Sequence, residues 1–269
     1  MASIGSTRTL RAAVLAAGLA LAASAPALAA PAPAPPTTCV PGKIVDFCRP
    51  VPPGHGFRLS NGDYRTIDGP GASLTVPYRS NNRGQVVGAY VVPNGTPGGR
   101  THGFLADKGT VRTVDGPGRA PTELVGINDR GRIIGGHVDA AGKSRYFLLR
   151  KGAFTPIDYP GAAGTVPFDI NDRDQVVGSY LDAAGAPHGF QLEDGVYTEI
   201  DTSAYPSAQL LGSNNRGQIV GGYLDAGGKV RGLLRDAKGN FTTFFAPQAI
   251  SQTGALDIND RRHMVGIFR

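Results

Sequence analysis

Two aspartates, Asp169 and Asp257, are the residues of this 269-residue sequence best suited to acid–base chemistry. Each stands two positions before a repeated Asn, and Arg79 holds the same position in another copy of the repeat. A pair of carboxyl groups about 5–10 Å apart can hydrolyse a glycosidic bond. The alternative is that Arg79 pairs with Asp257 across neighbouring repeats and fills a channel. We favour this pairing, and therefore assign no catalytic residue.

A second set of acids lies in links between predicted strands, at Asp139, Asp182 and Asp225. An Asp in a turn most often accepts hydrogen bonds from backbone N–H groups. Together such acids could also bind a cation or a polar sugar. The candidate ligand-binding residues are therefore Arg79, Asp139, Asp169, Asp182, Asp225 and Asp257.

Three histidines occupy one repeat position, at His55, His102 and His188, with Tyr146 and Arg231 taking that place in two further copies. Metal ligands must converge within a few ångströms, and residues of different repeats do not. The Asn- and Asp-rich turns suit Ca²⁺ poorly, since each offers at most two carboxylates beside an Arg. We predict no metal site and no cofactor. The sequence also lacks a Gly-x-Ser-x-Gly elbow, a metalloprotease His pair and a phosphate-binding loop.

The candidate residues above occupy equivalent positions of a sequence repeat, so the fold of the repeat determines where they lie. Its marker is an Asn that opens a turn such as Asn171-Asp172-Arg173-Asp174, and the spacing between markers is 47, 43, 43 and 45 residues. A fixed period of this length is typical of stacked supersecondary units. The marker residues are Asn81, Asn128, Asn171, Asn214 and Asn259.

Each unit contains four short runs with strand character. In the third unit these are 166–171, 175–181, 187–192 and 196–201, joined by links of hairpin length. A longer crossover then leads to the next marker. Four antiparallel strands followed by a crossover form the pattern of a β-propeller blade. Gly fills the last place of most marker turns, and we expect slight strain where Asp174 and Arg262 replace it.

The phase of the repeat predicts how the fold closes. The first strand runs, 55–59 and 64–68, match the third and fourth strands of a blade, whereas the last runs, 254–259 and 263–268, match the first and second. We therefore predict an all-β, five-bladed propeller of four-stranded antiparallel blades, in which N- and C-terminal strands share one blade. An open β-solenoid or a β-sandwich is the alternative architecture.

Over residues 55–269 the chain resembles the HAF-repeat family of probable extracellular bacterial repeat proteins. The residues that carry the likeness are His55-Gly56-Phe57, His102-Gly103-Phe104 and His188-Gly189-Phe190, with Ile-Asn-Asp-Arg-Gly and Val-Val-Gly-x-Tyr segments between them. The chain departs from the family in using Gly where the family name has Ala. The resemblance implies export and a repeated β fold, and it supplies no catalytic residue.

The N-terminal segment has the features of an exported protein. Arg8 and Arg11 precede an Ala- and Leu-rich run and a small-residue cleavage site at 27–29, which is typical of a secretory signal peptide. We expect a signal peptide (1–29), a Pro/Ala-rich linker (30–38), a lead-in with a Cys39–Cys48 disulfide (39–54) and one repeat domain (55–269). We expect no membrane span after cleavage.

The net charge of +6 falls to +4 without the signal peptide, which is too small an excess to predict nucleic-acid binding. We predict a monomeric, secreted protein, extracellular or periplasmic, that acts as a non-catalytic binding or structural module. Its favoured ligand is a polar glycan or a cell-surface polymer. Two alternatives stay open: a glycan hydrolase that uses the channel carboxylates, and an envelope adhesion protein whose arginine-rich rim meets an acidic polymer.

Overall fold

The computed structural model describes residues 54–60, 62–94, 99–119 and 121–269. The predicted signal peptide, the linker and the Cys39–Cys48 pair lie outside these residues. The described chain consists of β-strands joined by turns and one short 3-10 helix, η1 (Pro117–Arg119). None of its helices has the length and apolar character needed to cross a membrane.

Four sheets are complete antiparallel meanders in chain order. The first contains β3 (Leu74–Ser80), β4 (Val86–Val92), β5 (Arg100–Asp107) and β6 (Thr110–Thr113). The second contains β7 (Thr122–Ile127), β8 (Ile133–Val138), β9 (Ser144–Arg150) and β10 (Ala153–Ile157). The third contains β11 (Gly164–Ile170), β12 (Val176–Leu181), β13 (Pro187–Glu193) and β14 (Val196–Ile200). The fourth contains β15 (Gln209–Ser213), β16 (Ile219–Leu224), β17 (Val230–Arg235) and β18 (Phe241–Phe244).

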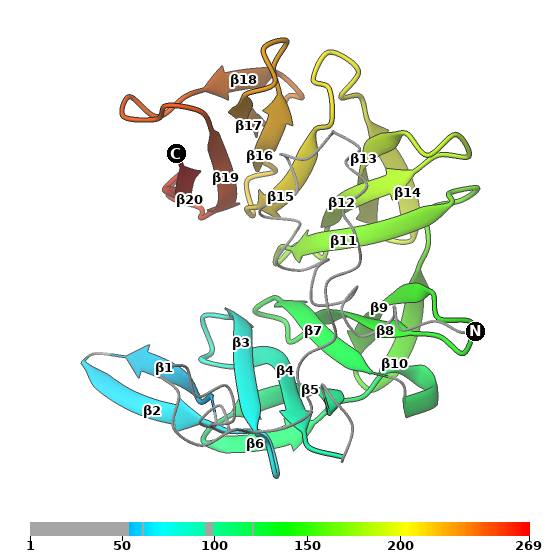
Figure 1. Ribbon diagram of the computed structural model, residues 1–269, viewed down its shortest axis with the longest axis vertical. Coiled ribbons are helices and arrows are strands. Elements are labelled where there is room, and N and C mark those ends of the chain that lie inside the picture. Colours follow the sequence, from blue (N-terminus) through cyan, green and yellow to red (C-terminus); the bar gives the residue numbers. More distant parts are fainter. Residues whose placement is uncertain (1–53, 61, 95–98, 120) are drawn as a thin grey trace, which may run out of the picture.

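These meanders confirm the predicted all-β repeat, and they are arranged like propeller blades (Figure 1). The first strand of each unit faces the centre, and each packs against the first strand of the next unit. The crossovers lead from the outermost strand of one sheet to the innermost strand of the next. The apolar core lies between the sheets, in layers that pair residues such as Tyr146 with Phe190 and Val177 with Leu233.

The two ends of the described chain form separate two-stranded sheets. These are β1 (Gly56–Ser60) with β2 (Asp63–Ile67), and β19 (Thr253–Ile258) with β20 (Met264–Phe268). Phe57 and Phe268 therefore lie in different sheets, where we expected one shared blade. Each hairpin is held by the neighbouring sheet instead: Gly54 forms a bridge with Leu74 of β3, and Gln252, next to β19, forms a bridge with Val230 of β17. The sheets form an arc whose ends are the two hairpins (Figure 1).

A β-bulge recurs where the first strand of each unit pairs with the second. In the third unit the register shifts between Pro167 and Asp169, and the other units shift at the same repeat position. The chains approach closely there, so that a Cβ on Gly178 would lie 2.3 Å from the Val166 carbonyl oxygen. Bulges change the direction of the side chains beside them. This one sets the direction of Arg79, Asp169 and Asp257.

The marker turns are joined by a ladder of hydrogen bonds around the axis. The Oδ1 atom of Asn171 accepts from the N–H groups of Arg173 and Gln175 in its own turn, while its Nδ2 donates to the Asn214 carbonyl at 3.1 Å. The side-chain amide allows this because it carries an acceptor oxygen for its own turn and a donor nitrogen for the next one. The same inter-turn bond, at 2.9–3.1 Å, joins Asn81 to Asn128, Asn128 to Asn171, and Asn214 to Asn259.

Candidate functional site

Arg79, Asp169 and Asp257 meet at the end of the channel that the marker turns surround. Arg79 Nη1 donates to Asp257 Oδ2 at 3.3 Å, and Asp169 Oδ2 accepts from Ser213 N at 2.7 Å and from Ser213 Oγ at 3.0 Å. All four line a polar cavity of about 590 Å³, which we call the channel mouth. Residues from four of the innermost strands, β3, β11, β15 and β19, are thereby brought together.

The environment of Asp169 favours its neutral form. Burial is the main cause that raises the pKa of Asp169 to about 6, and the Asp257 charge adds to it. The charge of Arg79 and the two hydrogen bonds from Ser213 act in the opposite direction. A carboxyl group with a pKa near 6 is partly protonated at neutral pH, which is a property of general acids.

The other predicted ligand residues, Asp139, Asp182 and Asp225, each stabilise their own turn. In Asp139, Oδ1 accepts from the N–H groups of Ala141 and Lys143, both at 2.9 Å. The pKa of the Asp139 carboxyl is lowered, first by the Lys143 N–H and then by the Arg145 side chain. Asp182 and Asp225 repeat this arrangement in the next two sheets. These turns lie at the other end of the strands from the channel mouth.

The strand register corrects one equivalence drawn from the sequence. Tyr90 pairs with His102 and Tyr180 with His188, whereas His137 pairs with Arg145. Arg145, and not Tyr146, therefore occupies the histidine position of its sheet. The basic side chain at this position contacts the carboxylate of a nearby acid in every unit. The pairs are His55 with Asp68, His102 with Asp115, Arg145 with Asp139, His188 with Asp182, and Arg231 with Asp225.

Tyr146 instead replaces a glycine. The equivalent Gly103 has no room for a side chain, because a Cβ there would lie 2.5 Å from the Val114 carbonyl and 2.9 Å from Leu124. Tyr146 is buried between the second and third sheets, and its ring lies over Gly136, where a Cβ would come within 2.9 Å of it. Burial raises the pKa of Tyr146 to about 12, so its hydroxyl stays protonated.

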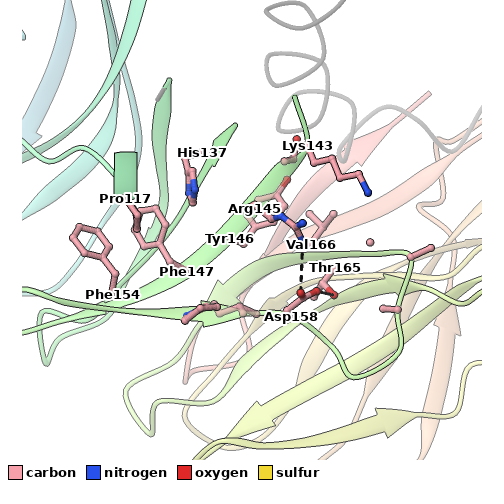
Figure 2. Close-up of a pocket in the computed structure, with 16 residues that line it drawn as sticks. Pro117, His137, Lys143, Arg145, Tyr146, Phe147, Phe154, Asp158, Thr165 and Val166 are labelled. Atoms are coloured by element: carbon pink, nitrogen blue, oxygen red, sulfur yellow. Dashed lines mark hydrogen bonds and ion pairs between the residues drawn. The ribbon is translucent and has the colours of Figure 1, made fainter. Parts of the chain in front are cut away.

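A cavity of about 840 Å³ lies beside Tyr146 (Figure 2), and we call it the inter-sheet pocket. One wall carries aromatic side chains from the second sheet, and the other consists of the segment 162–166 that leads into and forms the start of β11. Figure 2 shows Arg145 reaching toward Asp158, with an Nη1 to Oδ2 distance of 3.6 Å. The polar and aromatic side chains that line it are His137, Lys143, Arg145, Tyr146, Phe147, Phe154, Asp158 and Thr165.

His137 lines this pocket where three other units have a tyrosine. The hydroxyl groups of two of those tyrosines form hydrogen bonds: Tyr90 Oη lies 2.6 Å from Thr113 Oγ1, and Tyr180 donates to Glu199 at 3.0 Å. The Nδ1 atom of His137 is buried and has no hydrogen-bond partner in the described structure. Burial also lowers the pKa of His137, so its ring is neutral near pH 7.

The pocket was not predicted from the sequence, although the sequence carries a signal for it. The second sheet departs from all other units at two neighbouring positions, with His137 for Tyr and Tyr146 for Gly, and it shares Arg145 in place of His with Arg231 of the fourth sheet. Departures that cluster in one copy of a regular repeat indicate a specialised surface. Within the described residues, no group of three or more His, Cys, Asp or Glu side chains is arranged to hold a metal ion.

No protein-family model matches this chain, and no curated protein matches it. Among solved structures it is similar to TolB from Acinetobacter baumannii, at 13% identity and a TM-score of 0.49, over 68% of this chain and 45% of TolB. It is also similar to the fucose-specific six-bladed lectin of Aleuria aurantia, at 9% identity and a TM-score of 0.43, over 71% of this chain and 69% of the lectin. A prolyl endopeptidase matches at 16% identity and a TM-score of 0.46, over 69% of this chain and 30% of the peptidase. The chain thus spans under half of the TolB that it resembles, and these likenesses leave its function open.

Proposed function

We propose that this chain is a secreted, non-catalytic binding module that holds a sugar unit of a polar glycan in the inter-sheet pocket. The observation that carries the proposal is that this pocket is lined by His137 and Tyr146, whose residue types occur at these repeat positions in no other unit. A pocket of several hundred cubic ångströms with aromatic walls and a few polar groups is the usual form of a small-molecule site.

The lining of the pocket supports a sugar rather than a purely apolar ligand. Arg145 and Asp158 place hydrogen-bond donors beside acceptors, which suits neighbouring hydroxyl groups. The half-buried ring of Phe154 supplies an apolar surface for the C–H face of a pyranose. The buried ring of Phe147 supports it from behind, at 4.9 Å in an edge-to-face arrangement. The ammonium group of Lys143, which also lines the pocket, can pair with the carboxylate of an acidic sugar, so the pocket suits an acidic sugar as well as a neutral one.

The test is a thermal-shift and calorimetry screen with neutral oligosaccharides and uronic acid oligosaccharides. We expect at least one class to bind the unmodified chain and to lose tenfold or more in affinity with Arg145→Ala. Arg231→Ala is the matched control, because Arg231 pairs with Asp225 in the same way but lies outside the pocket. Equal loss in both variants, or binding by neither class, would contradict the proposal.

Glycan hydrolysis at the channel mouth is the second candidate, and the raised pKa of Asp169 favours it. The Asp257 carboxylate is engaged by Arg79, which is the reason we rank binding first. Release of reducing sugar by the unmodified chain, abolished by Asp169→Asn, would establish the enzyme. Binding without release would support the module.

The scaffold for this function, in our proposal, is a ring of five sheets. Its first four members are the complete meanders, and the fifth combines β19 and β20 with β1 and β2. The Arg79–Asp257 ion pair supports this arrangement, because it joins the last innermost strand to the first. A closed ring would leave no unpaired strand edge between the two ends of the chain.

A further inference from the structure

Every marker turn carries an exposed arginine at its third position, beside the channel mouth. The inter-turn hydrogen bonds hold these turns next to one another, so the guanidinium groups lie along one basic rim. The fourth position of the turn varies: it is Gly in three turns, Asp174 in the third and Arg262 in the fifth. The rim arginines are Arg83, Arg130, Arg173, Arg216 and Arg261.

The arginine of one turn lies beside the fourth residue of the next turn. A Cβ on Gly131 would lie 4.0 Å from Arg83 Nη1. A Cβ on Gly217 would lie 3.1 Å from Arg173 Nη2. The residue type at the fourth position therefore decides what charge each of these guanidinium groups meets.

The junction between the fourth and fifth turns reverses the charge found between the second and third. In the third turn the fourth residue is the acid Asp174, whose Oδ2 atom lies 2.7 Å from Arg130 Nη1. In the fifth turn the same position is held by Arg262, which is also left-handed, with φ of 65°. The inter-turn hydrogen bond joins the fourth and fifth turns as it joins the others. The pattern of the other turns therefore directs Arg216 toward a second guanidinium group.

Neither of these arginines is neutralised within the described part of the chain. Arg216 and Arg262 are exposed, and among the described residues their side chains form no hydrogen bond or ion pair. The acid of this junction, Asp260, is already engaged, because its two oxygens accept from Asn215 N at 2.8 Å and from Asn215 Nδ2 at 2.9 Å. Arg261 adds a third positive charge beside Arg262. A glycine at 262 would relieve both the left-handed strain and the repulsion, so the arginine gains nothing within its own fold.

We propose that Arg216 and Arg262 bind a tetrahedral dianion, phosphate or sulfate, at a place that we call the rim anion site. Each guanidinium group can offer two parallel N–H donors to such an anion. Three arginines against one hydrogen-bonded aspartate leave an excess of positive charge, which suits a dianion better than a single carboxylate. The inter-sheet pocket contains no marker-turn residue, so the rim anion site is independent of it.

The site is one junction and not the whole rim. Arg83 and Arg173 each lie beside a glycine, and Arg130 is neutralised by Asp174. Binding through the overall charge of the rim would depend equally on every exposed arginine and would weaken steeply with salt. Binding at the junction depends on Arg216 and Arg262 above the others.

The test is an NMR titration of the unmodified chain with sodium phosphate, at an ionic strength held constant with sodium chloride. The arginine Nε–Hε signals report binding. We expect the signals of Arg216 and Arg262 to shift together and to give one dissociation constant. Sodium sulfate should act in the same way, whereas sodium acetate should bind about tenfold more weakly. Equal binding of acetate, or no shift with either dianion, would overturn the proposal.

Two substitutions of Arg262 separate the site from the rim. Arg262→Gly restores the residue of three other turns and removes the left-handed strain, so we expect it to fold and to bind phosphate about tenfold more weakly. Arg262→Asp should pair with Arg216, as Asp174 does with Arg130, and should abolish phosphate binding.

Arg83→Gln is the matched control, because it removes one exposed rim charge that lies beside a glycine. We expect it to leave the dissociation constant for phosphate nearly unchanged. An unchanged constant in Arg262→Gly would overturn the proposal. An equal loss in Arg262→Gly and Arg83→Gln would also overturn it, since the anion would then bind through the charge of the whole rim.

Discussion

Arg79 and Asp257 are 178 positions apart in the sequence, yet the guanidinium of one donates to the carboxylate of the other at 3.3 Å. Their side chains are 32% and 38% exposed, so the ion pair itself contributes little to stability, about 0–1 kcal/mol. Its larger effect is electrostatic, since both groups act on the partly buried carboxyl of Asp169.

We therefore predict that the two partners shift the pKa of Asp169 in opposite directions. Arg79→Gln removes a positive charge and should raise this pKa above its value in the unmodified chain. Asp257→Asn removes a negative charge and should lower it. Carboxyl ¹³C chemical shifts followed against pH give the values, with the exposed Arg83→Gln as control. Shifts of the same sign in both variants would show that Asp169 does not sense this pair.

The stability of the fold should decrease as pH rises, because the pKa of the Asp169 carboxyl is higher in the folded chain than in the unfolded chain. The pKa of Asp169 is about 6 in the folded chain and near 3.8 when unfolded. Its contribution to stability is therefore fully present below the unfolded pKa and is lost as pH rises through 6. Asp169→Asn should stabilise the fold by about 1–3 kcal/mol at pH 7.5 relative to pH 4. Urea unfolding at both pH values measures the difference in free energy of unfolding between the variant and the unmodified chain. An equal difference at pH 4 and pH 7.5 would contradict the prediction.

Asp174 and Arg262 both replace glycine in a left-handed turn position, with φ of 67° and 65°. Asp174 is buried and pairs with Arg130 and Arg132, and it also accepts from Asn128 Nδ2 at 2.9 Å. We predict that Asp174→Gly destabilises the fold by about 1–3 kcal/mol, because these bonds outweigh the relief of strain.

Arg262→Gly is the matched control for that variant. Arg262 is exposed and makes no ion pair in the described structure, so the glycine should stabilise by about 0.5–1 kcal/mol. Free energies of unfolding in denaturant decide the comparison. If both variants change stability in the same direction, then the Asp174 contacts do not connect the second and third units as described.

The hydrogen-bond ladder predicts the effect of one conservative change, Asn171→Asp. The carboxylate keeps the acceptor that closes its own turn but loses the Nδ2 donor to Asn214 and to Gln175. The Gln175 Oε1 atom and the Asn214 carbonyl oxygen then face a buried carboxylate without a donor between them. We expect the free energy of unfolding to fall by about 1–3 kcal/mol. Thermal unfolding at pH 7 measures it. A change below a few tenths of a kcal/mol would mean that the ladder adds nothing to stability.

The strands could be predicted because the same strand and turn pattern recurs in every unit of the repeat. In the third unit the predicted run 175–181 and the observed β12 differ by one residue, and the link lengths fixed the antiparallel order. Phase also predicted that Arg79 and Asp257 would be neighbours. Local pattern sufficed for the strands, since alternation and turn chemistry act over a few residues, whereas the Arg79–Asp257 contact was predicted from the period of the whole chain.

Other features depend on contacts between units, which a repeat pattern does not contain. The bulge at Phe168 leaves no signature beyond Gly178 opposite it, and the place of Tyr146 became clear only when strand pairing aligned it with Gly103. The pocket could not be derived, because it depends on how far the second and third sheets stand apart. The separation of Phe57 from Phe268 is the feature in which the expected shared blade and the structure differ.

Hydrogen exchange with and without the tightest-binding oligosaccharide shows whether the ligand lies in the inter-sheet pocket or at the channel mouth. If the inter-sheet pocket is the ligand site, exchange should slow in 143–147 of β9 and in 158–166, on the two walls. The marker turns around Asn81 and Asn171 should exchange at unchanged rates. Slowing confined to those turns would place the ligand at the channel mouth and contradict the account.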